Sequence, residues 1–376
     1  MKEIICLFVL LLGHVCFAEV PLRVGLYGDA GSDSTGALNL FLWLARSPEI
    51  STTILTGESV QSDALTGIDL VVMPGGTATA YDSLGEVGRA KLKSYIENGG
   101  KYLGTGTGTA LLMAQSNDLD KCLNIIPYTS NGKLDSRLQL YVEINSTGAT
   151  ALGIPAGYGE DRSMRYSGGP WLVYKTGGIA NASFSTWGVY RSEINLKGRV
   201  TDRMLGSSAI VGGTFGAGKV VAFTHEPQYE YHKKRFIVGA IKWLTGREVT
   251  IPFHPHRRGA TSVAIAMGGV TLASVEPVVR SLDGNAGFDI TGFDPIDATF
   301  DSLERLDAML FPLGSDHADF VAGGISRTLV TETAAAGVKP FVWGSGTNVL
   351  PLQGATTCTD VADALSKVLT AFPTHE

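Results

Sequence analysis

Short apolar runs alternate with amphipathic segments early in this sequence, and this alternation constrains the fold more than any other feature. Apolar residues keep helical spacing in three segments. The first begins at about Thr35, the second runs from about Ser83 to Asn98, and the third follows residues 101–103 and ends at Gln115. Strands that alternate with helices predict a parallel sheet with helices on both faces, so we expect an α/β protein. The apolar runs have the length of buried strands and lie at residues 23–28, 52–55, 69–73 and 101–103.

The alternation weakens between about residues 125 and 208. Short runs interrupted by glycines and aromatic residues indicate antiparallel strands and loops inserted in or beside the sheet. A glycine-rich turn with an apolar strand over residues 211–224, and a helical pattern over 235–244, then complete the unit. Residues 247–259 contain two prolines and three arginines, which is typical of a linker.

A weak internal repeat indicates a second domain of the same kind. Three early segments recur later in the same order and at nearly constant spacing, which favours an internal duplication. We predict a first flavodoxin-like domain over residues 19–246, a linker over 247–259 and a smaller flavodoxin-like domain over 260–376. The matching segments are RVGL (23–26), DLVVMP (69–74) and LGTGT (103–107) with SVAI (262–265), DAMLFP (307–312) and WGSGT (343–347).

Residues 1–18 have the features of an export signal. Lys2 supplies a positive charge, residues 4–12 are apolar, and Ala18 is the small residue that signal peptidase requires. We expect cleavage after Ala18 and a secreted or periplasmic protein. The alternative is an uncleaved anchor, which fits less well because the run is short for a bilayer and His14 interrupts it.

The charge balance argues against nucleic acid as a partner. The 30 Lys and Arg residues are outnumbered by 36 Asp and Glu residues, giving a net charge of −6. A protein without a basic excess is not expected to bind a phosphate backbone. Beyond the signal, no apolar run is long enough for a transmembrane helix, so we expect no membrane association after cleavage.

Two cysteines, Cys122 and Cys358, would remain after signal cleavage, and their pairing stays open. Neither has a histidine close by in sequence, so we interpret both as structural rather than nucleophilic. Asn145 and Asn181 begin Asn-X-Ser/Thr sequons, which are acceptor sites only if the host glycosylates exported proteins.

Four segments together carry a family resemblance: residues 71–76 (VVMPGG), 95–104 (YIENGGKYLG), 165–170 (RYSGGP) and 218–228 (GKVVAFTHEPQ). Their order over about residues 20–246 resembles the class I glutamine amidotransferase-like fold, in the version called the biotin-protein ligase N-terminal domain. In active members of that family a strand leads into a tight Gly-x-Cys-x-Gly elbow that presents the nucleophile. A His-Pro-Glu segment after the last strand supplies the base and its orienting carboxylate.

This chain lacks a nucleophile at the position that the resemblance assigns to it. The elbow is GTGTG (104–108), so Gly106 stands where the attacking cysteine would be. Acyl transfer through a thioester is therefore unavailable at this elbow. The second repeat has Gly346 at its own elbow.

The other two triad positions are altered as well. Aligning on Pro227 places Glu226 where the family has its histidine and Gln228 where it has its carboxylate. A shift by one residue makes His225 the base but leaves Pro227 in place of the carboxylate. Neither alignment completes a triad. A site that has lost triad residues keeps only the residual catalysis that comes from its oxyanion hole and from substrate binding.

Other motifs do not support a metal or a cofactor. Residues 225–232 contain two His and two Glu, but Pro227 breaks any helix that would align them as ligands. Residues 213–219 imitate a phosphate-binding loop, yet Val220 replaces the Ser or Thr that would hold Mg²⁺. We therefore interpret the first stretch as polar surface and the second as a glycine hairpin, and expect no metal and no cofactor.

The sequence thus predicts a secreted amidotransferase-like protein without catalysis, which binds an unknown small molecule or protein at the carboxyl ends of its strands. The alternatives are a hydrolase with Glu226 or His225 as general base on water, and a purely structural secreted module. An enzyme would bury its base in a pocket with a perturbed pKa, whereas a module would have a filled or closed elbow. The residues predicted to line the crevice are Gly75, Gly76, Gly106, Thr107, Tyr166, His225, Glu226 and Tyr229.

Overall fold

The computed structural model describes most of the chain after the expected signal. The predictions made for residues 1–18, for most of the linker and for Gly346 fall outside the described residues, and the domain boundaries stay predictions. The described ranges are residues 20–114, 121–130, 137–157, 163–191, 204–252, 260–267, 270–285, 287–293, 306–313, 333–334, 338–344, 356–359 and 361–372.

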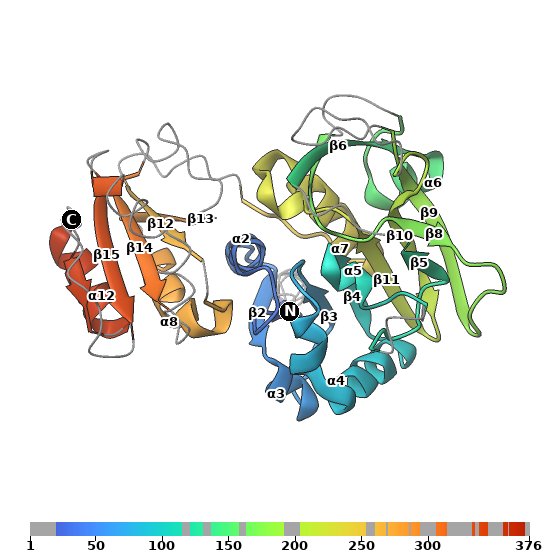
Figure 1. The fold of residues 1–376 in the computed structure, drawn as a ribbon, viewed down its shortest axis with the longest axis horizontal. Helices are drawn as coiled ribbons and strands as arrows, with labels where there is room; N and C mark the ends of the chain where they lie inside the picture. Colours follow the sequence, from blue (N-terminus) through green and yellow to red (C-terminus); the bar gives the residue numbers. More distant parts are fainter. Residues whose placement is uncertain are drawn as a thin grey trace, which may run out of the picture.

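Parallel strands form the centre of the first sheet (Figure 1). Their order from one edge is β2-β1-β3-β4-β11, and every neighbouring pair is parallel. This is the flavodoxin-like strand order, so the predicted α/β class is confirmed. The strands are β1 (Leu22–Tyr27), β2 (Ile50–Leu55), β3 (Leu70–Met73), β4 (Lys101–Thr105) and β11 (Gly218–Phe223).

Helices cover both faces of this sheet, because successive residues of each buried strand point to opposite sides. On β3, Leu70 and Val72 belong to one apolar cluster, whereas Val71 and Met73 belong to the other. The first cluster includes α2 (Ser34–Ala45) and α7 (Lys234–Thr245), and the second includes α3 (Gly57–Gln61) and α4 (Thr79–Glu97).

Within the described ranges, no helix has the length and hydropathy to cross a bilayer.

An antiparallel region extends the sheet beyond β11, as the sequence predicts. The β10–β11 hairpin turns at Gly216, which has φ 57°, so the stretch that imitates a phosphate loop is a glycine hairpin. The sheet continues from β10 through β9 and β6 to β7, and β8 pairs with β10 and β5. These elements are β5 (Tyr128–Ser130), β6 (Arg137–Ile144), α6 (Ser146–Leu152), β7 (Ser163–Ser167), β8 (Leu172–Tyr174), β9 (Ala182–Tyr190) and β10 (Ser208–Phe215).

The helix predicted to run from the elbow to Gln115 is a single turn, α5 (Thr107–Ala110). After this turn the backbone pairs with a distant segment instead of continuing the helix, since the Ala114 amide donates to the Tyr128 carbonyl over 2.9 Å. Tertiary pairing therefore overrides the helical spacing of the apolar residues that follow the elbow.

A second parallel sheet follows residue 260, with the order β13-β12-β14-β15-β16. Two aspartates occupy corresponding places, since Asp69 accepts from the Arg23 amide and Asp307 accepts from the Ser262 amide. These correspondences agree with the repeat, while its origin by duplication stays a prediction. The elements are β12 (Thr261–Ala266), α8 (Leu272–Asp283), β13 (Phe288–Phe293), β14 (Ala308–Leu313), β15 (Lys339–Gly344), β16 (Thr356–Cys358) and α12 (Val361–Ala371).

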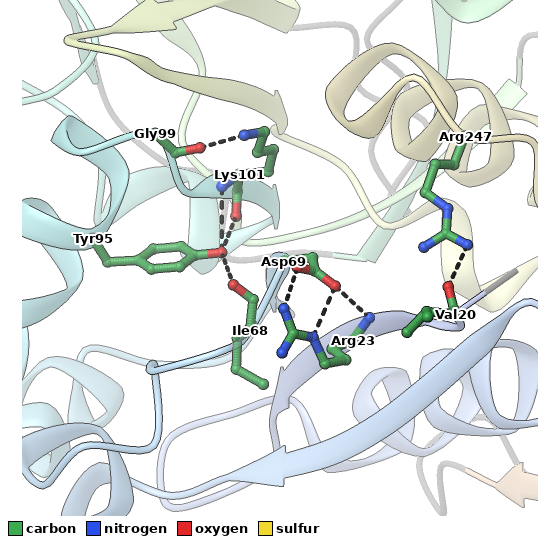
Figure 2. A network of polar contacts seen from close by, with 8 residues as sticks. All are labelled: Val20, Arg23, Ile68, Asp69, Tyr95, Gly99, Lys101 and Arg247. Carbon is green, nitrogen blue, oxygen red and sulfur yellow. Dashed lines mark hydrogen bonds and ion pairs between the residues drawn. The ribbon is translucent and has the colours of Figure 1, made fainter.

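A polar network ties the amino ends of the central strands together (Figure 2). The Arg23 guanidinium donates two hydrogen bonds to Asp69, and the Tyr95 hydroxyl lies between the backbones of Ile68 and Lys101. Burial raises the pKa of Tyr95 to about 12. This network therefore fixes the end of the sheet opposite the elbow.

Helix α2 is apolar on nearly all sides and lies between the two sheets. It packs on β1 and β2 with one side and on β13 and α8 with the other. Nine of its twelve residues are buried, including Leu38, Phe41 and Leu42. A helix that is apolar all round must be covered all round, so the second sheet supplies the outer cover of α2.

Gly239 sets how closely α7 approaches α6, and Gly239→Ala should destabilise the protein by about 2 kcal/mol. A Cβ atom at this position would lie 2.0 Å from the Leu152 carbonyl oxygen, which is backbone and cannot rotate away. Gly88→Ala in α4 is the matched control, because its nearest neighbour is the flexible Gln61 side chain at 3.2 Å. Urea unfolding measures both variants, and equal stability of the two would contradict this packing argument.

Candidate functional site

The elbow after β4 has a sharp backbone turn at its centre. Gly106 has φ 49° and ψ −118°, a conformation that residues with side chains rarely adopt. Its amide donates to the Phe223 carbonyl on β11 over 2.9 Å. Close approach of the elbow turn to the end of β3 requires Gly108, because a Cβ atom there would lie 2.1 Å from the Met73 carbonyl oxygen. The strained elbow is thus present, with glycine in the place of a nucleophile.

The Glu226 carboxylate lies over this elbow. A Cβ atom on Gly106 would be 3.4 Å from Glu226 Oε1, and one on Gly75 would be 2.7 Å from the same oxygen. Glu226 is only 4% exposed. The carboxylate therefore occupies the space into which a side chain at position 106 would extend, and two glycines leave room for it.

An arginine, a tyrosine and an aspartate extend the site from Glu226. Arg165 Nε lies 3.9 Å from Glu226 Oε2, and the guanidinium carbon lies 3.8 Å from the centre of the Tyr229 ring. The Tyr229 hydroxyl donates to both carboxylate oxygens of Asp33, each at 2.7 Å. Burial raises the pKa of Tyr229, and the negative charges of Asp33 and Glu226 raise it further, so the hydroxyl remains a donor.

Backbone and side-chain hydrogen bonds join the loops that carry these groups. The Asp33 amide donates to the Gly75 carbonyl over 2.6 Å. Thr105 Oγ1 accepts from the Gly75 amide and from Gln228 Nε2, both at 3.2 Å. Gln228 stands where the family has its orienting carboxylate, yet here it binds a threonine of β4 and orients no base.

His225 lies in the apolar core beside the site. Its ring contacts those of Phe223 and Tyr190 edge-on, and the side chain is fully buried. Neither ring nitrogen makes a hydrogen bond of good geometry within the described residues. Burial lowers its pKa to about 3, despite the opposing effect of the Ala209 carbonyl. His225 is therefore neutral at physiological pH and is packed as a core residue.

Three further predicted residues lie close to the elbow in different environments. Tyr166 is fully buried, and its hydroxyl donates to the Gly169 carbonyl. Thr107 is partly buried and donates through Oγ1 to the Gly76 carbonyl over 2.5 Å. Gly76 has φ 142°, and a Cβ atom there would lie 2.0 Å from the Gly31 carbonyl oxygen. These contacts order the loops around the elbow.

The fold brings four predicted residues, Gly75, Gly106, Glu226 and Tyr229, into one group. Sequence analysis missed two other members, Asp33 and Arg165. Asp33 lies in the Gly/Ser/Asp turn after β1, and Arg165 is the first residue of the RYSGGP segment. Both segments were noticed in the sequence, but nothing in the sequence indicates that these two residues lie near Glu226. Assignment of the predicted residues to ligand binding stays a prediction.

The two remaining cysteines are buried, and neither forms a disulfide within the described residues. Cys122 Sγ donates to the Ala110 carbonyl at the end of α5, and burial raises the pKa of this thiol to about 11. Cys358 is on β16 of the second sheet. Within the described ranges, no group of three or more His, Cys, Asp or Glu side chains is arranged to hold a metal.

The two sequon asparagines differ in their surroundings. The Asn145 side chain caps α6, accepting from the Gly148 amide and donating to the Thr186 carbonyl. Asn181 is exposed in a turn before β9, with φ 61°. Glycosylation at either residue stays a prediction. A glycan on Asn145 would be attached to Nδ2, the nitrogen that donates to the Thr186 carbonyl, whereas the cap uses Oδ1.

Comparisons with known proteins support the fold of the first sheet. A family model described as biotin-protein ligase, N terminal, matches residues 42–114, a stretch that includes Gly75 and the elbow. Residues 42–114 thus resemble a domain of the class I glutamine amidotransferase-like superfamily. A search of curated proteins finds no significant match to the chain.

Solved structures with related folds share little sequence with this chain. A cytoplasmic protein from Salmonella typhimurium LT2 is 12% identical, with 60% of this chain and 97% of that chain covered and a TM-score of 0.40. A ThuA-like protein from Parabacteroides merdae is 12% identical, with 62% and 94% covered and a TM-score of 0.42. A beta-galactosidase from Bacillus circulans sp. alkalophilus is 10% identical, with 61% and 31% covered and a TM-score of 0.38. These scores are too low to bear on function.

Proposed function

We propose that this is a secreted, non-catalytic binding protein that uses the elbow end of its amidotransferase-like sheet to hold a small molecule or a protein segment. The signal-like residues 1–18 support export. The carboxyl ends of the strands support the location, because open α/β sheets place their ligands there.

The observation that carries the non-catalytic part of this proposal is the Glu226 carboxylate that fills the space over Gly106, a feature that a structural module would share. Glycine has no group that can attack an acyl carbon, and the space that a thiol would need holds a carboxylate instead. The neighbouring His225 is packed in the apolar core, and burial lowers its pKa to about 3, so this imidazole is too weakly basic and too enclosed to supply the missing base. Thioester chemistry therefore lacks its nucleophile and its base.

The surrounding groups suit polar recognition. Two acidic side chains, Asp33 and Glu226, flank Gly75, and the Arg165 guanidinium lies against Tyr229 beside them. Such a partly buried set of fixed donors and acceptors can orient a polar ligand without chemistry. A hydrolase that uses Glu226 as general base is the second candidate, because this buried carboxylate lies over the elbow with the Arg165 guanidinium beside it.

The purified protein should release no ammonia from glutamine, and neither should Gly106→Cys. The Cβ atom of the new side chain would lie 3.4 Å from Glu226 Oε1, so its thiol would lie beside a carboxylate, which disfavours a thiolate. A coupled ammonia assay, with an active glutamine amidotransferase as positive control, measures both proteins. Release by the unaltered protein would overturn the non-catalytic proposal, and release by Gly106→Cys alone would contradict the account of the missing base.

Thermal-shift screening of the protein against small molecules then tests binding, with Glu226→Gln as the site variant. A shift that is lost in Glu226→Gln supports a small-molecule site at the elbow. Turnover of a hydrolysable compound that Glu226→Gln abolishes while still binding it would establish the hydrolase instead. If no compound shifts the melt while a protein co-purifies, the small-molecule form of the proposal is wrong.

A further inference from the structure

A groove of about 680 Å³ lies on the antiparallel extension of the first sheet. Its floor is formed by β9 and β10 and its wall by α6 and α7. Thr214 on β10 pairs with Lys219, which in turn pairs with Lys101 at the start of β4, whereas the elbow follows the end of β4. The groove is therefore a separate feature from the elbow site.

The groove is lined by hydroxyl and aromatic groups. No Asp, Glu, Lys, Arg or His is among its lining residues. The aromatic members are Phe184, Trp187 and Trp243, and the floor includes Gly212 and Gly213. The hydroxyl members are Ser146, Thr147, Thr150, Ser183, Ser185 and Thr214.

The two indoles are held in place by the backbone beneath them. A Cβ atom on Gly212 would lie 2.0 Å from the Trp187 ring, so only glycine lets this indole lie against β10. Trp187 Nε1 donates to Ser185 Oγ over 3.1 Å. The Trp243 ring meets Trp187 edge-on with centres 4.9 Å apart. The aromatic corner is therefore fixed before any ligand arrives, which lowers the entropy cost of binding.

The hydroxyls stand along both sides of this corner. Ser183 and Ser185 on β9 are exposed, and so are Ser146, Thr147 and Thr150 on α6. Each hydroxyl has one donor hydrogen and two acceptor lone pairs. The Thr150 hydroxyl already donates to the Ser146 carbonyl, so it would accept from a ligand. A ligand with many hydroxyls of its own is therefore matched along the whole groove.

We propose that this groove binds a neutral saccharide. The uncharged lining offers no ion pair to a charged ligand. A purely apolar ligand would remove water from the hydroxyls of the groove and give them no hydrogen-bond partner in return. A sugar ring combines a face of C–H groups, which packs on an aromatic side chain, with hydroxyls around its edge. That combination fits the partly exposed Trp243 indole, which packs edge-on against the buried Trp187 between two rows of hydroxyls.

Calorimetric titration of the full chain with maltotriose, cellotriose, xylotriose and mannotriose tests this proposal, with tryptophan fluorescence as a second readout. At least one of these probes should bind with a millimolar or lower Kd. Thr150→Ala and Ser185→Ala should each weaken binding about fivefold through the loss of one hydrogen bond. Ser183→Trp should block the groove and abolish binding.

Thr370→Ala is the matched control. Thr150 and Thr370 are both exposed helix residues whose hydroxyls donate to the carbonyl four positions earlier, at 3.0 and 2.8 Å. Thr370→Ala should bind like the unaltered protein, and so should the elbow variant Glu226→Gln, which separates this proposal from the proposed function. Absence of binding by all four probes, equal binding by the groove variants and Thr370→Ala, or binding of tri-alanine in their place would overturn the proposal.

Discussion

Arg46→Met should lower the free energy of unfolding by about 4 kcal/mol, because it takes the guanidinium away from the largely buried Asp283 carboxylate between the two sheets. Arg46 Nη2 lies 2.6 Å from Asp283 Oδ1, and the two side chains are only 12% and 13% exposed. The same guanidinium donates to Asp283 through Nε and to the Ile290 carbonyl. Urea unfolding monitored by circular dichroism measures the loss.

The double variant Arg46→Met with Asp283→Leu should recover most of that stability. Replacing both members of a buried ion pair by apolar side chains removes the uncompensated charge together with the pair, and is often close to neutral. Lys91→Met is the control in an exposed pair, since Lys91 and Asp63 are 39% and 93% exposed, and it should cost less than about 1 kcal/mol. Equal losses from Arg46→Met and Lys91→Met would show that the contact between the sheets contributes no more than a surface pair.

The contact between the sheets also reaches the elbow site. α2 begins directly after Asp33, and the Ser34 hydroxyl donates to the Val270 carbonyl, just before α8. The Ala273 amide of α8 donates to the Gly28 carbonyl, just after β1. The loop that carries Asp33 is therefore bonded on one side to the start of α8 and on the other to Gly75. Arg46→Met should accordingly speed hydrogen exchange in this loop as well as lower global stability.

Sequence alone predicted the central sheet because its signals are local. The DLVVM run at residues 69–73 is apolar throughout, as a strand covered on both faces must be, and glycines mark the turn that follows it. The α5 helix was predicted too long because the apolar residues after the elbow keep helical spacing, whereas the Ala114 amide in fact pairs with Tyr128. That pairing depends on a segment whose position the local pattern does not encode.

The site was predicted only in part, for a related reason. Asp33 and Tyr229 are joined by a hydrogen bond that spans most of the first sheet's sequence, and no local pattern links them. His225 and Glu226 are neighbours in sequence, and the spacing could not say which of them faces Gly106. The backbone directs Glu226 over the elbow and His225 into the aromatic core. Adjacent residues that leave a strand point in opposite directions, so only the end of β11 decides between them.

Acidification should unfold this protein in part through His225. In the unfolded chain this imidazole has a pKa near 6.5, whereas burial lowers the pKa to about 3 in the folded protein. Between those two values the unfolded state binds a proton that the folded state excludes. Above about pH 6.5, protonation of His225 therefore does not lower the free energy of unfolding. Below that pH it lowers the free energy of unfolding by about 1.4 kcal/mol per pH unit, and by about 4 kcal/mol in total at pH 3.

His225→Leu should remove this part of the pH dependence, because a leucine can pack between Phe223 and Tyr190 and binds no proton. Carboxylates titrate over the same range in both proteins, so the quantity to compare is the difference in their unfolding free energies at pH 7, 6, 5 and 4. The exposed His232→Gln is the control, and it should keep the steep loss because His225 is still present. Parallel pH profiles for the unaltered protein and His225→Leu would mean that the imidazole is protonated or solvated in the folded state. The same result would remove the physical ground for excluding His225 as a base at the elbow, since a core histidine that takes up protons near neutral pH must be reached by water.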